Sequence, residues 1–430
     1  MPRFFGRRST PDREFENSNR EFTNSDREFE NSDREFENPD REFTNSNREF
    51  ENSDRECSSL LSAARVEQLE CRVLTIPTDA READGTIAWD KTTMVLVTAR
   101  SGGTTGLGWT YGPAACADII SSLFTPLVVG TDAMSVPGTW REMVRAGRND
   151  TRPGVVGYAL GAVDTALWDL KARLLGLSLA DLFGRVHDDV PVYGSGGFTT
   201  YDDARTTEQL THWAIEQRIP RVKIKIGESW GSRMDRDIHR IRLARKVIGD
   251  DTQLFVDANG GYTIKQAVRL MGDVADARVT WFEEPVSSDD LTGLALIRGM
   301  IDADVAAGEY GSDVGYFQRM CAAGAVDCLQ VDATRAGGYT GWLQAVAVAA
   351  GHGLQVSGHC APHLHAPVAA ATPNLRHLEW FHDHVRIESM LFEGTLDPAG
   401  GTITPDPSRP GNGLTVREGV AAGYETQTPG

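Results

Sequence analysis

Two lysines on one face of a predicted strand are the first residues in this sequence that suggest chemistry. The stretch RVKIKIGES (221–229) places Lys223 and Lys225 two positions apart between apolar residues. Because successive side chains on a strand point to opposite faces, both ammonium groups project the same way. Near a divalent metal, each lysine lowers the pKa of the other, so one can be a base near pH 7. We predict that Lys225, nearer the strand end, is this base, and that Lys223 tunes it and contacts a substrate carboxylate.

Three carboxylates follow at equal spacing, each near the end of a predicted strand. LFVDAN contains Asp257, TWFEEP contains Glu283 and DVAAGE ends in Glu309, with 26 residues from each carboxylate to the next. One strand and its helix span about that length, so the three carboxylates would top successive strands. They would repel one another unless a cation lay between them. Hard oxygen ligands of this kind suit Mg²⁺.

A second acid–base pair lies further along the chain. CLQVDA contains Asp332 and LQVSGH ends in His359, again at predicted strand ends. An acid on one strand end can orient an imidazole on the next and raise its basicity. We therefore predict that His359, oriented by Asp332, is a second base. HLEWF then places Glu379 on the eighth strand.

These residues need a fold that brings strand ends together, and the pattern beyond residue 188 supplies one. Short apolar strands alternate with helical segments, which predicts an α/β fold with a (β/α)8-type barrel. Active sites on this fold lie at the carboxyl ends of the strands. The apolar positions of 221–229 suit the helix side, so Lys223 and Lys225 point into the barrel. The eight strands read VPVYGS, VKIKIG, LFVDANG, TWFEEP, DVAAGE, CLQVDA, LQVSGH and HLEWF.

The region before the barrel has an α+β pattern. Residues 66–76 and 92–100 resemble strands and flank a polar, glycine-containing loop around 79–90. The glycines of GLGWTYG, which follows, do not fit a nucleotide-binding motif. Helical patterns then cover 113–124, 133–147 and 155–175.

Residues 12–57 repeat a polar heptad with arginine at every seventh position. Each heptad offers one apolar residue, whereas a coiled coil needs two, and its Asn, Ser and Pro39 residues disfavour a helix. The segment cannot bury enough apolar surface to offset its ordering entropy. We predict that residues 1–65 form a disordered tail.

Composition limits the classes of partner. The chain has 430 residues, is 40% hydrophobic and carries a net charge of −18. This charge argues against nucleic acid or an anionic membrane as the main partner. Six cysteines without a CxxC pair indicate reduced thiols, and we find neither a long apolar run nor a signal peptide. We expect a cytoplasmic protein that acts on a small molecule.

Taken together, VKIKIG, VDANG, FEEP, AAGE, the Asp332–His359 pair and HLEW resemble the enolase superfamily, specifically its mandelate racemase-like subgroup. The resemblance covers residues 66–425. It implies a modified TIM barrel over 188–388. It also implies an α+β capping domain over 66–187, to which a C-terminal segment, 389–430, returns. A homo-oligomer, either a dimer or an octamer, is expected by the same analogy.

The resemblance also assigns roles to individual residues. FEEP offers two glutamates; the first is taken as a ligand by its position, and Glu284 is expected to face away or to lie behind the ligands. The implied roles are Mg²⁺ ligands at Asp257, Glu283 and Glu309, bases at Lys225 and at His359 with Asp332, a hydrogen bond to the enolate oxygen at Glu379, and substrate contacts at Ser195 and Asn259.

The chemistry shared by this subgroup is abstraction of the proton α to a carboxylate, giving an enolate stabilised by Mg²⁺. Lys225 and His359 should approach opposite faces of the α-carbon. We predict a lyase that dehydrates a sugar acid, an aldonate or aldarate, to a 2-keto-3-deoxy acid, because the subgroup is rich in such dehydratases. Tyr193 and His363 are expected to add polar groups to the mouth. The alternative is a racemase, epimerase or cycloisomerase acting on an α-substituted carboxylate.

Two other classes are weighed against this enzyme. A zinc hydrolase is suggested by the HxH pairs His363/His365 and His382/His384, but in amidohydrolase-like barrels that motif lies on the first strand and these pairs come late. A non-catalytic binding protein on an old enzyme scaffold is the other. The presence of every expected acid, base and ligand argues against it.

Overall fold

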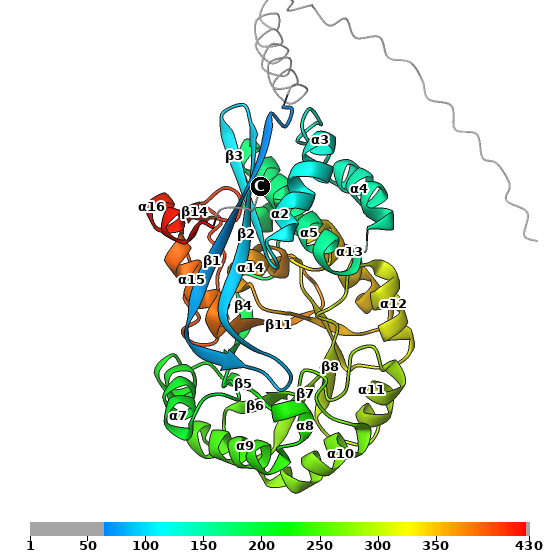
Figure 1. Cartoon of the computed structure of the whole chain (residues 1–430), viewed down its shortest axis with the longest axis vertical. Helices are drawn as coiled ribbons and strands as arrows, with labels where there is room; N and C mark the ends of the chain where they lie inside the picture. The colour runs from blue at the N-terminus through cyan, green and yellow to red at the C-terminus, as the bar shows by residue number, and fades with distance from the viewer. Residues whose placement is uncertain (1–63, 151, 427–430) are drawn as a thin grey trace, which may run out of the picture. The chain divides into compact units, whose positions relative to one another are not determined.

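The computed structural model describes residues 64–150 and 152–426 (Figure 1). The predicted disordered tail lies outside these ranges except for its last two residues, of which Arg65 forms an isolated bridge with Asp132. Within the described ranges, no helix is long and apolar enough to cross a membrane.

Eight parallel strands form a closed barrel, as the sequence predicts. Neighbouring strands are consecutive in the chain, and the last pairs with the first, with Leu378 opposite Val192. A short strand, β13 (Thr402–Ile403), pairs antiparallel with the first barrel strand. The barrel strands are β4 (Val190–Gly196), β5 (Arg221–Lys225), β6 (Gln253–Asp257), β7 (Val279–Glu283), β8 (Asp304–Ala307), β9 (Cys328–Val331), β10 (Gln355–Gly358) and β11 (Leu375–Phe381).

Helices cover the outer face of these strands (Figure 1). Val222 and Ile224 of β5 belong to the main apolar core together with helix residues such as Ile241. Lys223 and Lys225 face the barrel interior, as the alternation predicts. A separate interior cluster comprises Tyr193, Phe255, Trp281, Ala306 and Cys328. The helices are α7 (Asp203–Thr211), η4 (His212–Glu216), α8 (Glu228–Gly231), α9 (Met234–Ile248), α10 (Ile264–Asp273), η5 (Ala275–Ala277), α11 (Leu291–Arg298), α12 (Val314–Ala322), α13 (Gly338–Gly351), α14 (Pro362–Ala370) and α15 (His382–Leu391).

A three-stranded antiparallel sheet precedes the barrel in the chain, in the order β1-β2-β3. Its strands are β1 (Gln68–Ala83), β2 (Ala88–Ser101) and β3 (Thr104–Tyr111). The prediction of a loop over 79–90 is wrong for most of that segment, because the strands pair again after an irregularity and only 84–87 remains as a turn. Asp84 closes this turn by accepting the backbone N–H groups of Thr86 and Ile87.

Helix α5 packs against this sheet because two glycines of β3 allow a close approach. A Cβ at Gly106 would lie 2.3 Å from the Ala166 carbonyl oxygen, and one at Gly108 would lie 2.4 Å from the Ala166 nitrogen. The helical segments of this region are α2 (Ala115–Ile119), η1 (Ile120–Phe124), α3 (Thr125–Val128), α4 (Val136–Ala146), η2 (Gly147–Asn149), η3 (Arg152–Val156), α5 (Gly157–Leu174) and α6 (Leu179–Phe183).

The C-terminal segment contacts the N-terminal sheet. Arg72 of β1 forms ion pairs with Glu418 at 2.7 Å and with Glu425 at 3.1 Å. The exact domain boundaries stay predictions. The elements of this segment are β12 (Phe392–Glu393), β14 (Thr415–Val416), α16 (Glu418–Ala421) and η6 (Ala422–Tyr424).

Replacing Gly108 with alanine should destabilise the protein, because the added methyl group would press on the α5 backbone. Overpacking of this kind costs about 1–3 kcal/mol. The control is Gly272→Ala near the end of α10, where a Cβ meets open space; this change should stabilise by up to about 1 kcal/mol. Urea unfolding of the three proteins measures both effects. Equal stability of Gly108→Ala and the parent would contradict the packing argument.

Candidate active site

Strand register places three charged residues at one level of the barrel mouth. Lys225 lies opposite Asp257. Asp257 in turn lies opposite Glu283. Glu309 follows the next strand, two residues beyond the end of β8. The spacing of these residues in the sequence thus corresponds to neighbouring strand ends in space.

Asp257, Glu283 and Glu309 could hold a metal ion. All three are buried, and one carboxylate oxygen from each lies within 4.8 Å of the others. Glu309 Oε2 is buried and accepts no hydrogen bond from the residues that the structure describes, so it is available to a cation. Carboxylate oxygens are the hard ligands that Mg²⁺ prefers. The donor set therefore fits the divalent cation that the sequence predicts.

The adjacent Glu284 is not turned toward solvent. Its side chain is buried, and its backbone has a φ of +39°. Burial raises the pKa of the Glu284 carboxyl well above its ordinary value, and the charge of Glu309 raises it further. Glu284 is therefore buried close enough to the ligand group to interact with its charge.

Two lysines offset the negative charge of this group. Lys223 Nζ lies 2.5 Å from Glu283 Oε1 and 2.7 Å from Glu379 Oε1. Lys225 Nζ lies 2.5 Å from Asp257 Oδ2. Burial raises the pKa of Asp257, but the two lysines bring it down to about 2.

The predicted lowering of the Lys225 pKa is outweighed by this pairing. Burial lowers the pKa of Lys225, and so does the charge of Lys223. The attractions of Asp257, Glu379 and Glu283 together outweigh both effects, so the pKa lies above its ordinary value. The lysine-pair argument overlooked that each ammonium group lies directly against a carboxylate.

His359 and Asp332 form the predicted pair. His359 Nδ1 lies 2.8 Å from Asp332 Oδ2, so Nδ1–H donates to the carboxylate and Nε2 is left as the acceptor. Nε2 lies 3.4 Å from Glu309 Oε2, on the side of the ligand group. Burial raises the pKa of Asp332, but the hydrogen bond from His359 helps to hold it well below its ordinary value. The imidazole is thus held in the tautomer that a base requires.

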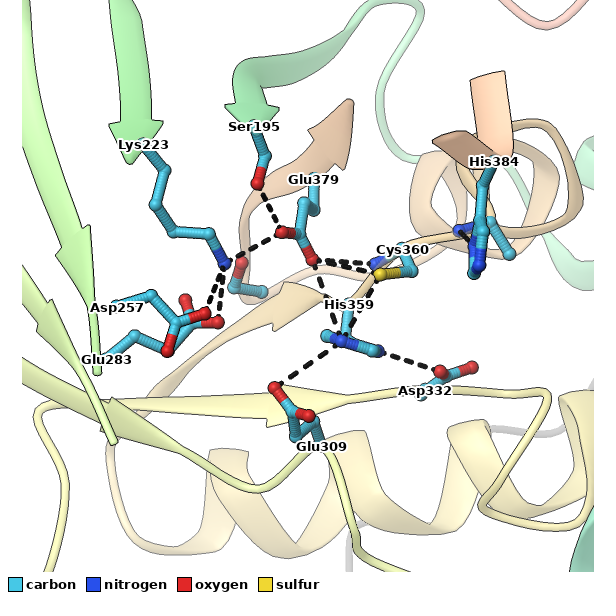
Figure 2. A network of polar contacts seen from close by, with 12 residues as sticks. Ser195, Lys223, Asp257, Glu283, Glu309, Asp332, His359, Cys360, Glu379 and His384 are labelled. Carbon is cyan, nitrogen blue, oxygen red and sulfur yellow. Dashed lines mark hydrogen bonds and ion pairs between the residues drawn. The ribbon is translucent and has the colours of Figure 1, made fainter. Parts of the chain in front are cut away.

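Glu379 is the centre of the hydrogen-bond network in Figure 2. Its Oε1 accepts the Ser195 hydroxyl at 2.6 Å, and its Oε2 accepts the Cys360 N–H at 2.9 Å. Burial raises the pKa of Glu379, but Lys223 and other cations lower it well below its ordinary value. An ionised carboxylate only accepts hydrogen bonds. The predicted hydrogen bond from Glu379 to an enolate oxygen would require a protonated carboxyl and stays a prediction.

A cavity of about 450 Å³ adjoins these groups. Lys225, Glu309 and His359 line it from the barrel, and Asn259 lies beside them, where a substrate contact is predicted. Ser195 is fully buried and its hydroxyl is bonded to Glu379, so its predicted contact with substrate stays a prediction. The opposite wall comes from the N-terminal sheet and its following loop, through Trp89, Lys91, Thr92, Thr93, Tyr111, Gly112 and Pro113.

Two polar side chains expected at the mouth lie elsewhere. Tyr193 is fully buried inside the barrel, where its ring centroid lies 4.7 Å from that of His377. It is two residues before Ser195 on β4 and therefore deeper in the barrel. His363 Nδ1 lies 2.6 Å from Glu388 Oε2, and His363 does not line this cavity.

The HxH pairs do not form a zinc site. Both ring nitrogens of His365 are engaged, Nε2 by the Ala333 N–H at 2.8 Å and Nδ1 by the Cys360 carbonyl at 2.8 Å. Among the described residues, no group of metal-ligating atoms includes His363, His365 or His384. His382 belongs to such a group with Asp79 and Glu82, but without His384, so neither HxH pair converges on one ion.

The sequence-based prediction omitted Arg335 and Cys360. Arg335 Nη1 lies 3.2 Å from Glu309 Oε1, and its guanidinium lies 5.2 Å from the Tyr310 ring centroid. Cys360 Sγ lies 3.2 Å from His359 Nε2. Arg335 is three residues after Asp332 and Cys360 directly follows His359, so closeness to a strand-end acid or base could have indicated both.

The closed barrel, the N-terminal sheet and the strand-end carboxylates define the class of enolase-like TIM-barrel proteins. Residues 205–420 match the family described as enolase C-terminal domain-like, and residues 76–184 match the mandelate racemase/muconate lactonizing enzyme N-terminal domain. The chain belongs to the mandelate racemase/muconate lactonizing enzyme family, as its motifs predicted.

Similar proteins include solved structures and curated relatives. A mandelate racemase/muconate lactonizing enzyme-like protein from Rubrobacter xylanophilus is 48% identical, with a TM-score of 0.81 over 84% of this chain and 100% of that one. A racemase from Streptomyces coelicolor A3(2) with bound magnesium is 27% identical, with a TM-score of 0.79 over 84% and 100%. D-galactarolactone cycloisomerase of Agrobacterium fabrum is 30% identical over 85% of this chain and 96% of its own length. L-talarate/galactarate dehydratase of Salmonella typhimurium is 29% identical over 68% and 74%.

Substituting Glu309 by glutamine should weaken Mg²⁺ binding at least about tenfold, because a charged ligand becomes a neutral amide. Isothermal titration with Mg²⁺ measures the affinity. Glu216→Gln, a change at an exposed position in η4, should leave it unchanged. Equal affinity in the parent and in Glu309→Gln would show that the ion binds elsewhere.

Glu82 should make stability depend on pH. It is buried beside the cavity wall, with its Oε2 2.9 Å from Trp89 Nε1. Burial, and then the charge of Asp383, raise its pKa to about 9. A raised folded-state pKa gives stability that is full below the ordinary carboxyl pKa and is lost as pH rises through about 9.

As pH rises from about 5 to about 9, the melting temperature of Glu82→Gln should therefore fall less than that of the parent. Differential scanning calorimetry across this range measures the loss, with exposed Glu393→Gln as the matched control. Parallel losses in the parent and in Glu82→Gln would mean that Glu82 is ionised in the folded protein.

Proposed function

We propose that this protein is a Mg²⁺-dependent enzyme that removes the proton α to the carboxylate of a sugar acid and dehydrates it to a 2-keto-3-deoxy acid. One observation carries the proposal: two groups that can transfer a proton, Lys225 and His359, line the same cavity as the buried carboxylate Glu309. Curated relatives that are named as dehydratases of talarate, galactarate, arabinonate and gluconate support a sugar acid as substrate.

The residues divide the work of proton abstraction. When bound, Mg²⁺ supplies positive charge against the negative charge that develops on the substrate carboxylate. Its ligands would be Asp257, Glu283 and Glu309. His359 Nε2 can take the α-proton because Asp332 holds the proton on Nδ1.

Dehydration also needs an acid for the leaving hydroxyl. Lys225 ends β5 and His359 directly follows β10, and these are separate strands of the closed barrel, so each residue can address a different face of the α-carbon. One removes the α-proton, and the other protonates the β-hydroxyl, which leaves as water as the carbon–carbon double bond forms. The resulting enol becomes the 2-keto-3-deoxy acid. Lys91, Thr92 and Asp383 line the cavity and suit the hydroxyl groups of a sugar chain.

Racemisation, epimerisation or cycloisomerisation is the second candidate. Two proton-transfer groups that reach one cavity also permit reprotonation from the opposite face. A racemase from Streptomyces coelicolor and the D-galactarolactone cycloisomerase are among the similar proteins, which favours this candidate. Because both reactions begin with the same enolate, the product distinguishes them.

NMR of the protein with Mg²⁺ in D₂O, across a set of aldonates and aldarates, tests the proposal. We expect a 2-keto-3-deoxy product from at least one acid. Deuterium at the α-carbon of unchanged or epimerised acid would instead establish the second candidate. His359→Asn and Lys225→Met should lower turnover at least about 100-fold, whereas Lys246→Met, on the exposed side of α9, should not. The absence of both product and exchange across the set would refute the proposal.

A further inference from the structure

A second cluster of metal-ligating atoms lies beside the carboxylate group, and this one contains sulfur. His359 Nε2, Cys360 Sγ and a Glu379 carboxylate oxygen are buried and lie within 4.8 Å of one another. Figure 2 shows the three side chains converging, with dashed lines from the thiol to each of the others. The proposed reaction gives the Cys360 thiol no role.

The separations of the three atoms fit a tetrahedral metal site. Sγ lies 3.2 Å from His359 Nε2 and 3.4 Å from Glu379 Oε2. Nε2 lies 3.9 Å from Oε2. Zinc bonds of about 2.3 Å to sulfur and about 2.0–2.1 Å to nitrogen and oxygen separate such ligands by roughly 3.4–3.6 Å at tetrahedral angles. Movements of a few tenths of an ångström would therefore bring all three atoms into coordination.

The histidine is already oriented for a metal. Its Nδ1–H donates to Asp332 at 2.8 Å, which leaves the Nε2 lone pair directed at the cluster. A carboxylate that holds the other ring nitrogen of a metal-binding histidine fixes the tautomer and raises the basicity of the ligand. Asp332 therefore prepares His359 for a metal ion by the same contact that prepares it for a proton.

A cation bound at this cluster would take the place of the thiol proton. Cys360 has one S–H and two acceptors within reach, His359 Nε2 and Glu379 Oε2. A divalent cation would replace that proton: the S–H bond breaks, a metal–sulfur bond forms, and one proton passes to solvent without oxidation. His359 and Cys360 both line the cavity, so an ion can reach them by the route that a substrate would take.

Sulfur distinguishes this cluster from the carboxylate group next to it. Three carboxylates suit a hard cation, whereas a thiolate with an imidazole selects softer ions such as Zn²⁺ or Co²⁺. We propose that His359, Cys360 and Glu379 form a site for a thiophilic divalent cation, separate from the Asp257–Glu283–Glu309 group. An ion bound there takes the Nε2 lone pair and so prevents His359 from accepting a proton. The binding does not depend on the proposed function; the inhibition does.

Cobalt absorption tests the binding without any turnover. Co²⁺ is added to the full-length, reduced protein in excess Mg²⁺, and the near-ultraviolet thiolate-to-cobalt charge-transfer band is followed. We expect a saturable band from one thiolate per chain, with one proton released per ion. Cys360→Ser should abolish the band, and Cys71→Ser, at a half-buried cysteine on β1, should retain it. No band in the parent, or a band that persists in Cys360→Ser, would overturn the proposal.

Two further variants cover the case in which Cys360→Ser does not fold. His359→Asn and Glu379→Gln both keep the thiol, and each should weaken Co²⁺ binding at least about tenfold, since removing even an outer partner of a ligand costs 10–100-fold. Unchanged affinity in both would also overturn the site. Once a substrate is known, adding Zn²⁺ in excess Mg²⁺ should slow α-proton exchange. Unchanged exchange at saturating Zn²⁺ would refute the proposed inhibition and would not affect the binding result.

Discussion

The pairing of two inward-facing lysines with buried carboxylates is the interaction on which the barrel mouth depends. Strand register brings Asp257 and Glu283 side by side, and without compensation their charges would repel. Lys223 and Lys225 project from the neighbouring strand and pair with Glu283 and Asp257, respectively. Removing one partner of a buried ion pair typically costs about 3–5 kcal/mol, because the remaining charge stays buried and unpaired. The two lysines are therefore part of the structural core as well as candidates for proton transfer.

Glu379 connects the lysine side of the mouth to the histidine side. Its two oxygens are divided between them: Oε1 faces Lys223 and Ser195, and Oε2 faces Cys360. Because both oxygens are engaged, the carboxylate cannot rotate without breaking contacts on both sides. The charge of Lys223 and the position of Cys360 are thus coupled through the Glu379 side chain. A metal ion bound to Cys360 and Glu379 would therefore also change the surroundings of Lys223.

Much of this arrangement follows from sequence, because strand alternation and the length of a strand–helix unit are local properties. They predict the eight strands, the inward direction of Lys225 and the meeting of the carboxylates. They do not give the depth of a side chain within the barrel. The sequence therefore predicts Tyr193 at the mouth, whereas its side chain is buried in the barrel below the mouth. They also do not give contacts after a strand ends, which is why Arg335 was missed. The direction of the Lys225 pKa shift depends on contacts with carboxylates, above all the one with Asp257 at 2.5 Å. The spacing of residues in the sequence does not give such a distance.

The N-terminal sheet is held over the barrel by polar contacts at its own turn-side end. The Thr92 hydroxyl donates to Asp383. Arg386 Nη2 donates to Asp383 Oδ1 at 2.6 Å and to the Pro77 carbonyl oxygen at 2.8 Å. The sheet thereby supplies one cavity wall, while the barrel supplies acids, bases and carboxylates. The groups proposed to form an enolate thus come from the barrel, and the sheet adds side chains that the proposal assigns to the rest of the substrate. Under the proposed function, substitutions in the wall would change the substrate or the fate of the enolate without disturbing the buried charge balance. This would account for similar proteins that carry the names of dehydratases, racemases and cycloisomerases.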